Sequence, residues 1–488
     1  MKLRVKNLDL STGGPLVAVL NDEDARKLGL YASDRIVIKK GKNEISVLIN
    51  VAENHGKIKG GTIGLFEEVL REMKLKNNDF VGVHMDNKPE SLQYVKSKLD
   101  GKELDKKEMN EIVSDIVGNK LSEIEISFFV SACYKNNLSI NEVGYLTQAI
   151  VDNSKVIDFK GKTVDKHCTG GLPGNRTSMV VIPIVAAANL KIPKTSSRAI
   201  TSPSGTADVM EVLAPVNLTR ENIINVVKKT NGCIVWGGAL DLASADDKII
   251  KIERILSLDP EGMLLSSIMA KKKAVNADYV LIDIPVGREA KIKTRKNAKR
   301  LKKKFIKLGR KLNMKVKVII SNGEQPIGNG IGPALEAKDV MSVLAGDGPA
   351  DLKEKGINMA GIILSMAGIR NGEKRSREIL ESGMALEKMH EIIKAQGGKI
   401  RNIEVGDYSY SVKSSKNGNV SYISNSTINK VCRILGCPKD KKAGLYLNFK
   451  LGNKVKKGQE LFKIYAESKT KLDYGVEFLR KNKIVMVS

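Results

Sequence analysis

The stretch 165–178 constrains this chain more than any other part of it. It reads Asp-Lys-His-Cys-Thr-Gly-Gly-Leu-Pro-Gly-Asn-Arg-Thr-Ser, and an apolar run, 179–188, follows directly. This order predicts the end of a strand, a glycine-rich loop and the start of a buried helix. Glycines let several backbone N–H groups surround one point, and a helix N-terminus adds partial positive charge there. The loop therefore predicts an anion site, and phosphate is the anion that suits it best.

A second segment, 194–208, strengthens this prediction. It reads Lys-Thr-Ser-Ser-Arg-Ala-Ile-Thr-Ser-Pro-Ser-Gly-Thr-Ala-Asp and is rich in hydroxyl groups. The alternative for the first loop alone is an ordinary tight turn between a strand and a helix. Two hydroxyl-rich segments close together in the sequence, each with cations, favour the anion site over that alternative.

Length and composition indicate a folded protein of several domains. The chain has 488 residues, of which 42% are hydrophobic, so it exceeds what one core usually holds. Its 5 cysteines are an odd number scattered along the chain, which is typical of a reduced cytoplasm. No run approaches the ~18 apolar residues of a membrane span. We expect a cytoplasmic protein with no membrane partner.

The residue pattern predicts a multidomain α/β fold. Runs of β-branched residues at 17–20, 35–38 and 45–49 indicate strands, and helical spacing of apolar residues follows them. Strands then alternate with helices, which is typical of a mainly parallel sheet. The hairpin pattern at 452–461 resembles that of barrel-sandwich domains. We predict a small β-rich N-terminal accessory or assembly domain, a helical lobe, a central α/β phosphate-binding domain with a mainly parallel sheet and a C-terminal α+β domain with barrel-sandwich-like hairpins: 1–86, 87–160, 161–400 and 401–488.

The net charge of +27 leaves two interpretations open. A basic protein can bind nucleic acid, and the segment 291–317 is very rich in lysine. However, Ala298, Leu301, Phe305 and Leu308 recur there at helical spacing, so the lysines would coat the solvated face of an amphipathic helix. The excess charge is spread over the whole chain, which favours a protein with no specific nucleic-acid partner. An RNA-binding protein remains the non-enzyme alternative.

Residues 90–488 resemble the thymidine/pyrimidine nucleoside phosphorylases, and most closely their AMP phosphorylase branch. The run 166–171, Lys-His-Cys-Thr-Gly-Gly, is similar to the family's Lys-His-Ser-Thr-Gly-Gly. The block Gln-Pro-Ile-Gly at 325–328 is similar to a later family motif. The run 197–202, Ser-Arg-Ala-Ile-Thr-Ser, and the extra N-terminal domain are features of the AMP phosphorylase branch.

The resemblance implies phosphorolysis of an N-glycosidic bond. In the AMP branch, AMP and inorganic phosphate give adenine and ribose 1,5-bisphosphate, and CMP or UMP are further candidate substrates. The resemblance also implies a homodimer or a larger homo-oligomer. Positioning and preorganised charge supply most of the acceleration in such a reaction. We therefore expect no metal and no cofactor, with inorganic phosphate as a co-substrate.

By match to the family motif, the attacking phosphate would be held by Lys166, Ser178, Thr206 and the backbone of Gly170 and Gly171. Cys168 stands where many relatives have a serine that donates to phosphate. A thiol is a weaker donor than a hydroxyl, so this contact is altered here. Arginine and hydroxyl groups suit the 5′-phosphate of the nucleotide. For that group the resemblance implies the segment of Ser197, Arg198, Ala199, Ile200, Thr201 and Ser202.

Four further residues are implied at the base and sugar. Ser267 and Lys271, one helical turn apart, match a pair that binds the base in the family. Asp259 matches the acid that protonates the departing adenine, a role that requires a raised pKa. Lys291 matches another position that contacts AMP. A solvated lysine run is the alternative for Lys271, and a helix or turn cap is the alternative for Asp259.

Two other enzyme classes stay open. A pyrimidine nucleoside phosphorylase would carry an arginine between the two lobes, and Arg254 is nearest to that position but out of register. A phosphoribosyltransferase would need diphosphate, Mg²⁺ and an acidic metal pair, which the sequence does not offer in a convincing position. The family's layout also implies that residues near 244–274 rejoin the helical lobe.

Overall fold

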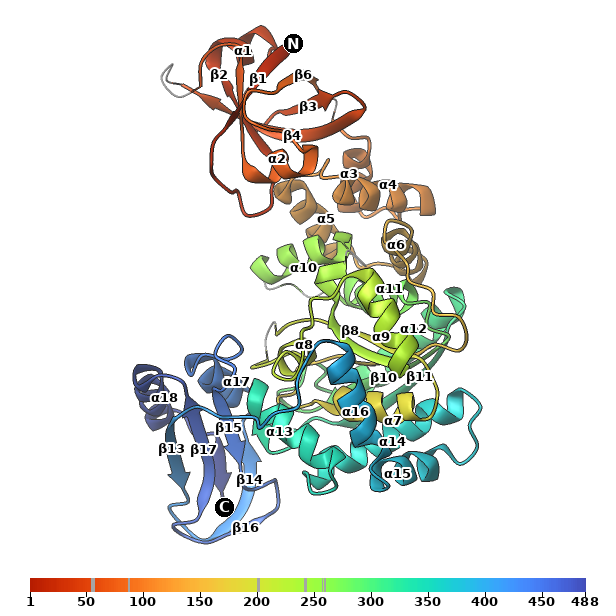
Figure 1. Ribbon diagram of the computed structural model, residues 1–488, viewed down its shortest axis with the longest axis vertical. Coiled ribbons are helices and arrows are strands. Elements are labelled where there is room, and N and C mark those ends of the chain that lie inside the picture. The colour runs from red at the N-terminus through yellow and green to blue at the C-terminus, as the bar shows by residue number, and fades with distance from the viewer. Residues whose placement is uncertain (54–57, 87, 200–201, 241–243, 257, 259) are drawn as a thin grey trace. The chain divides into compact units, whose positions relative to one another are not determined.

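The computed structural model describes residues 1–488 apart from 54–57, 87, 200–201, 241–243, 257 and 259 (Figure 1). The chain forms two compact units. The first comprises Met1–Asn153 and Ser244–Ser267, and the second comprises Ser154–Ala243 and Ile268–Ser488. Within the described residues, no helix combines the length and the apolar character that crossing a membrane requires.

The N-terminal part of the first unit is a closed barrel with the strand order β1-β5-β2-β4-β3-β6. Alternate residues such as Ile36 and Ile38 are fully buried inside it, as the period of a strand requires. The short helix α1 (Asp22–Lys27) begins at Asn21, whose side chain accepts a hydrogen bond from the Glu23 N–H at 3.0 Å. The other elements are β1 (Lys2–Asn7), β2 (Val17–Asn21), β3 (Arg35–Lys40), β4 (Asn43–Ala52), β5 (Thr62–Leu65), α2 (Glu67–Met73) and β6 (Phe80–Met85).

The rest of the first unit is helical, as the spacing of its apolar residues predicts. Asp105, Ser122 and Ser139 each begin a helix with a capping box, which satisfies the first N–H groups of that helix. A buried ion pair joins two of the helices, with Lys98 Nζ 2.7 Å from Glu142 Oε1. The helices are α3 (Ser91–Leu99), α4 (Lys106–Val117), α5 (Glu123–Asn136), α6 (Ile140–Asp152) and α10 (Ser244–Leu256).

The second unit contains a parallel sheet that positions the candidate site. Strands β11 (Lys315–Asn322), β10 (Tyr279–Val286) and β7 (Val164–Cys168) pair in that order, and β8 (Ile192–Ser196) pairs with β9 (Gly232–Trp236). All of these pairings are parallel, and a single bridge between Thr163 and Lys191 connects the two groups. The loops after β7, β8 and β10 therefore leave the carboxyl ends of parallel strands, where α/β proteins bind ligands.

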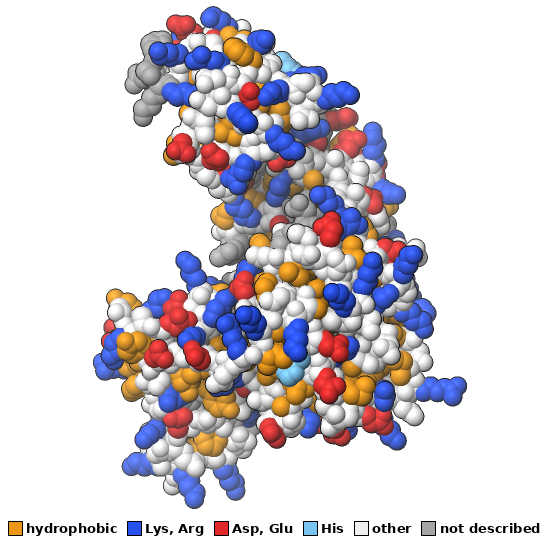
Figure 2. Space-filling model, in the orientation of Figure 1, with side chains coloured by type: hydrophobic (Ala, Val, Ile, Leu, Met, Phe, Trp, Pro, Cys, Tyr) orange, Lys and Arg blue, Asp and Glu red, His pale blue; other side chains and the backbone are white. Residues whose placement is uncertain are grey.

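Helices cover this sheet and supply most of its core. Helix α7 (Thr177–Ala187) is buried along its whole length. Helix α12 (Arg295–Lys311) buries Ala298, Leu301, Phe305 and Leu308, as their spacing predicts, and turns its basic residues outward. Figure 2 shows Lys and Arg scattered over the visible face, with Asp and Glu between them. The other helices are α8 (Thr206–Met210), α9 (Arg220–Thr230), η1 (Gly237–Leu240), α11 (Glu261–Ala274), α13 (Pro333–Leu344), α14 (Ala350–Met366), α15 (Gly372–Glu381) and α16 (Met384–Ala395).

The C-terminal part of the second unit is α+β. One sheet has the order β12-β15-β17-β13 and another has the order β16-β14-β18. The two strands nearest the predicted hairpin, β16 and β17, therefore pair with different neighbours. The elements are β12 (Gly330–Ile331), β13 (Tyr408–Lys413), β14 (Gly418–Ile423), α17 (Asn425–Ile434), β15 (Gly444–Leu447), β16 (Lys454–Val455), β17 (Glu460–Ala466), α18 (Lys469–Lys481) and β18 (Val485–Val487). The multidomain α/β fold predicted from the sequence is confirmed.

Candidate active site

The glycine-rich loop 169–176 joins the end of β7 to the start of α7. Gly170 and Gly171 have φ of +88° and +83°, which side chains rarely tolerate, and these angles turn the loop sharply. Gly174 has φ of +69°, and a Cβ on it would lie 2.4 Å from the Ile327 carbonyl oxygen. The sequence thus forms a tight strand–loop–helix turn, with the block at 325–328 packed against it.

Lys166 lies beneath this loop and is only 1% exposed. Its ammonium group donates to Ser178 Oγ in the first turn of α7, at 3.3 Å. Burial lowers the pKa of Lys166, because an ammonium group out of water loses hydration. Two of the residues predicted to hold phosphate are therefore adjacent, and a buried cation is held at the base of the loop.

Further buried charges surround Lys166. Asp165 Oδ2 lies 2.5 Å from Lys272 Nζ, and its other oxygen lies 3.6 Å from Lys194 Nζ. On the next strand, Asp283 Oδ2 lies 2.9 Å from Lys355 Nζ. Burial is the main cause that lowers the pKa of His167 well below its ordinary range, and the nearby ammonium groups add to it. His167 is therefore neutral near pH 7, and the positive charge comes from lysines.

The thiol of Cys168 is also neutral. Burial raises its pKa, and Asn175 Nδ2 lies 3.3 Å from the sulfur. A neutral thiol is a weak hydrogen-bond donor and a poor nucleophile. Cys168 thus offers an anion a weaker hydrogen bond than a serine hydroxyl would.

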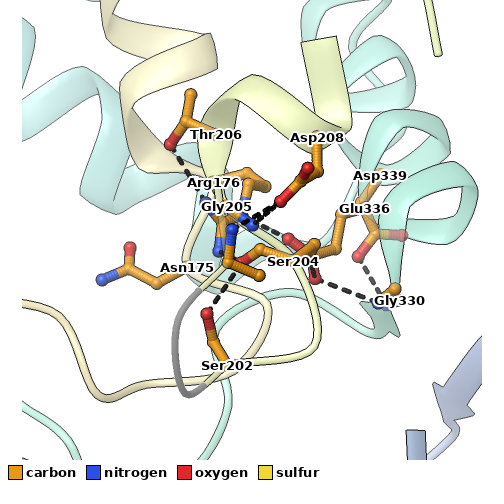
Figure 3. Close-up of polar contacts among 12 residues, drawn as sticks. Asn175, Arg176, Ser202, Ser204, Gly205, Thr206, Asp208, Gly330, Glu336 and Asp339 are labelled. Atoms are coloured by element: carbon orange, nitrogen blue, oxygen red, sulfur yellow. Dashed lines mark hydrogen bonds and ion pairs between the residues drawn. The ribbon is translucent and has the colours of Figure 1, made fainter. Parts of the chain in front are cut away.

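Arg176 connects the glycine-rich loop to the segment 197–205 (Figure 3). Its Nη1 donates to Thr206 Oγ1 at 3.0 Å, and its Nη2 donates to the Ser204 carbonyl oxygen at 2.9 Å. Its Nε donates to Glu336, a buried carboxylate that also accepts from the Ser204 hydroxyl and, at 3.0 Å, from the Gly332 N–H. The two hydroxyl-rich segments therefore lie side by side.

Sequence reasoning missed this buried ion pair. Neither Arg176 nor Glu336 was predicted to have a charged partner. The two residues are separated by 160 positions, so no local period links them. The one signal in the sequence was that each residue is the single charge in a glycine-containing block, Arg176 in 169–176 and Glu336 in 328–336.

The segment after β8 is held by carboxylates. Arg198 forms a forked pair with Glu211, at 2.7 Å and 2.6 Å, and its Nη1 also donates to Asp208 at 3.2 Å. Asp208 accepts the N–H groups of Ala199 at 2.7 Å and Gly205 at 2.8 Å. Lys441 Nζ lies 2.6 Å from the same Glu211. These contacts fix the shape of the segment around Arg198.

The other predicted residues are distributed as follows. Lys291 lies against the glycine-rich loop, because a Cβ on Gly171 would be 2.8 Å from the Lys291 backbone nitrogen. In the first unit, Ser267 donates to Asp246 Oδ2 at 2.9 Å. Lys271 follows one turn later on α11, in the second unit. Ser197 is exposed and Ser202 is partly buried. Ile200, Thr201 and Asp259 lie outside the described residues.

Family models match most of this chain. A glycosyl transferase family helical bundle domain matches residues 92–154, and the a/b domain of that family matches 160–386. A pyrimidine nucleoside phosphorylase C-terminal domain matches 419–485. The chain also resembles a crystal structure of anthranilate phosphoribosyltransferase from Thermus thermophilus, with a TM-score of 0.53 and 16% identity. That alignment covers 62% of this chain and 99% of the other, and at this identity it shows the fold alone.

Similar proteins match along nearly the full length. The AMP phosphorylase of Methanocaldococcus jannaschii is 45% identical, and the alignment covers 98% of this chain and 96% of that protein. The AMP phosphorylase of Pyrococcus abyssi is 47% identical over 99% of this chain and 97% of that protein. The AMP phosphorylase of Thermococcus kodakarensis is 44% identical over 100% and 98%. The chain belongs to the AMP phosphorylase family.

Proposed function

We propose that this protein cleaves AMP with inorganic phosphate and releases adenine and ribose 1,5-bisphosphate. An oxygen of the phosphate forms a bond to C1′ of the ribose, and the bond from C1′ to the base nitrogen breaks. The base leaves with that electron pair and takes up a proton. The observation that carries this proposal is the pair of hydroxyl-rich segments joined through Arg176, in a chain so similar to proteins named AMP phosphorylase.

The attacking phosphate binds over the glycine-rich loop in this proposal. Lys166 supplies a buried cation, and Ser178 beside it supplies a hydroxyl. The oxygen of Thr206 accepts from Arg176, so its own hydrogen is left to donate to phosphate. With the N–H groups of Gly170 and Gly171, these donors orient the nucleophile and replace its hydration before the reaction.

The 5′-phosphate binds at 197–202, where Arg198 supplies the charge and the hydroxyls of Ser197, Thr201 and Ser202 supply further donors. Ser267 and Lys271 bind the base, and Lys291 contacts the nucleotide. Asp259 protonates the departing adenine. These roles are implied by the family resemblance. The position of Lys291 against Gly171 supports the proposed contact of Lys291 with the nucleotide.

The reaction needs positioning and charge rather than redox or Lewis-acid chemistry, so we propose that no metal or cofactor takes part. A rate that is unchanged by EDTA supports this, and a rate restored only by Mg²⁺ refutes it. We also propose a cytoplasmic location and a homodimer or larger assembly. Light scattering of the purified protein tests the assembly, and a monomeric mass would exclude it.

A substrate panel tests the proposed reaction. Phosphate-dependent release of the base is measured with AMP, CMP, UMP, adenosine, thymidine and uridine. The proposal predicts release from AMP, with CMP and UMP as further substrates, and little from the unphosphorylated nucleosides. Activity confined to thymidine and uridine would instead identify a pyrimidine nucleoside phosphorylase. RNA binding that weakens with salt, without phosphorolysis, would identify an RNA-binding protein.

A further inference from the structure

The loop 287–292, which follows β10, carries Lys291 and is closed on itself. Its ends are joined by a bridge between Val286 and Ile292, and the Gly287 N–H donates to the Ile292 carbonyl at 3.3 Å. Inside the loop, the Ala290 N–H donates to the Gly287 carbonyl at 3.1 Å. The loop is therefore a short, hydrogen-bonded turn, and fixing one of its side chains fixes the rest.

One side of this loop lies against the glycine-rich loop. A Cβ on Gly171 would be 2.8 Å from the Lys291 backbone nitrogen and 3.1 Å from the Lys291 Cβ. The two backbones pass this close only because Gly171 has no side chain, and such close packing leaves them little freedom to move independently. A displacement of the loop 287–292 would therefore displace both Lys291 and the N–H groups near Gly171.

On the other side of the loop, the Glu289 side chain contacts the C-terminal domain. Its carboxylate accepts from the Tyr422 hydroxyl at 2.7 Å, from the Ser424 hydroxyl at 3.2 Å and 3.3 Å, and from the Ser426 N–H at 2.8 Å. Ser424 is also the cap of α17, accepting from the Thr427 N–H at 3.1 Å. Partial burial alone would raise the pKa of Glu289, but these donors outweigh that effect and lower the pKa, so the group is a carboxylate at neutral pH.

Two further contacts join the C-terminal domain to the loop and to the strand that precedes it. The Arg288 guanidinium lies 5.1 Å from the centre of the Tyr422 ring. Asn425 Nδ2 donates to the Gly323 carbonyl at 3.2 Å, and the Gly323 N–H donates to the Val286 carbonyl at 2.8 Å. Hydrogen bonds to a buried or partly buried charge are stronger than neutral ones and fix direction more closely. The end of β14 and the start of α17 thus contact the tip of the loop directly, and Asn425 reaches the end of β10 through Gly323.

We propose that Glu289 is a positioning residue, through which the C-terminal domain sets the place of Lys291 and of the phosphate-binding backbone at Gly171. This inference rests on the proposed function, because it assigns substrate contacts to those two residues. It gives the C-terminal domain a role in substrate binding, although the domain supplies none of the predicted substrate contacts.

Kinetics of Glu289→Gln and Tyr422→Phe test the proposal. Both variants remove part of the charge-assisted contact, and we expect KM for AMP and for phosphate to rise by about tenfold, with a smaller change in kcat. The matched control is Glu460→Gln, since Glu460 is another carboxylate of the C-terminal domain that accepts from a serine hydroxyl, that of Ser411. The control should keep the wild-type KM.

Thermal unfolding and hydrogen exchange distinguish positioning from mere stability. The proposal predicts faster amide exchange at 287–292 and 169–171 in Glu289→Gln, in a protein that stays folded at the assay temperature. A lowered Tm with unchanged KM and unchanged exchange would overturn it. If the wild-type protein does not phosphorolyse AMP, the proposed function fails, whereas the exchange result still decides whether Glu289 positions the two loops.

Discussion

The two loops that Arg176 connects differ in the burial and in the charge partners of their cations. Lys166, under the glycine-rich loop, is 1% exposed, and its closest described partner is the neutral Ser178 hydroxyl at 3.3 Å. Arg198, in the segment after β8, is 32% exposed at its side chain and is paired with Glu211 and Asp208. The first loop buries a charge that an anion would balance, whereas the second loop already balances its charge.

This difference fits two anions of different mobility. An inorganic phosphate ion must be captured and aligned for attack, and a buried ammonium group provides the strongest attraction for it. In the proposed reaction the 5′-phosphate arrives attached to a nucleotide, so the cation proposed for it, Arg198, needs direction more than strength. Arg198 donates to its carboxylate partners twice through Nη1 and once through Nη2, and these contacts fix the plane of its guanidinium.

The largest effect should come from Lys166→Met. It removes the buried cation but keeps an unbranched apolar stem, so we expect turnover to fall by about 10³-fold or more while the fold survives. Steady-state rates and circular dichroism measure the two properties. Lys160→Met, which replaces an exposed lysine just before β7, is the control and should be active. Near-normal turnover in Lys166→Met would remove the phosphate role of this loop.

Arg198→Lys should have the next largest effect, and it should weaken the binding of AMP rather than that of phosphate. Lysine keeps the charge but loses the planar fork, so KM for AMP should rise by about tenfold while KM for phosphate stays within about twofold. Initial rates with each substrate varied in turn measure both constants. If the KM values for AMP and for phosphate rose together, the two loops would not bind separate anions, and the contrast drawn between Lys166 and Arg198 would be wrong.

Raising the pH should remove the charge of Lys166 before that of Arg198. Burial lowers the pKa of Lys166 below the ordinary lysine value of 10.5, so the ammonium form is lost as the pH rises through that lowered pKa. Glu211 raises the pKa of Arg198 further, so that group stays charged. We expect kcat/KM for phosphate to fall at a pH below the ordinary lysine range, since that ratio reports the free enzyme. A flat profile up to that range would contradict a buried, titrating Lys166.

Cys168→Ser should give the smallest change. A hydroxyl donates better than the neutral thiol, so we expect KM for phosphate to fall about two- to threefold with kcat nearly unchanged. The same kinetic assay detects it. A higher KM for phosphate in the serine variant would show that the sulfur fills space rather than limits binding.

Local patterns in the sequence predicted the fold well. The β-branched run at 17–20 became β2, and Ala298, Leu301, Phe305 and Leu308 became the buried face of α12. Each of these signals is contained in a few neighbouring residues, and burial of an apolar face enforces it. Ile200, Thr201 and Asp259 lie outside the described residues, so their roles stay predictions.

The contacts that assemble the site were not predictable in the same way. Arg176 meets Glu336 across 160 residues, and Glu289 meets Tyr422 across 133. A single long-range pair leaves no period in the sequence, and neither partner alone shows which residue it contacts. Arg198 was predicted as a phosphate ligand, but its pairing with Glu211 and the contact of Lys441 with that carboxylate became visible only in three dimensions.

A crystal structure of the protein with AMP and sulfate tests the central claim most directly, because sulfate mimics inorganic phosphate without reacting. We predict a sulfate ion at Lys166, Ser178 and the backbone of Gly170 and Gly171, and the 5′-phosphate of AMP at Arg198. The ribose should lie between the two anions. Both anions bound at one of the loops, or AMP bound away from both, would contradict the account.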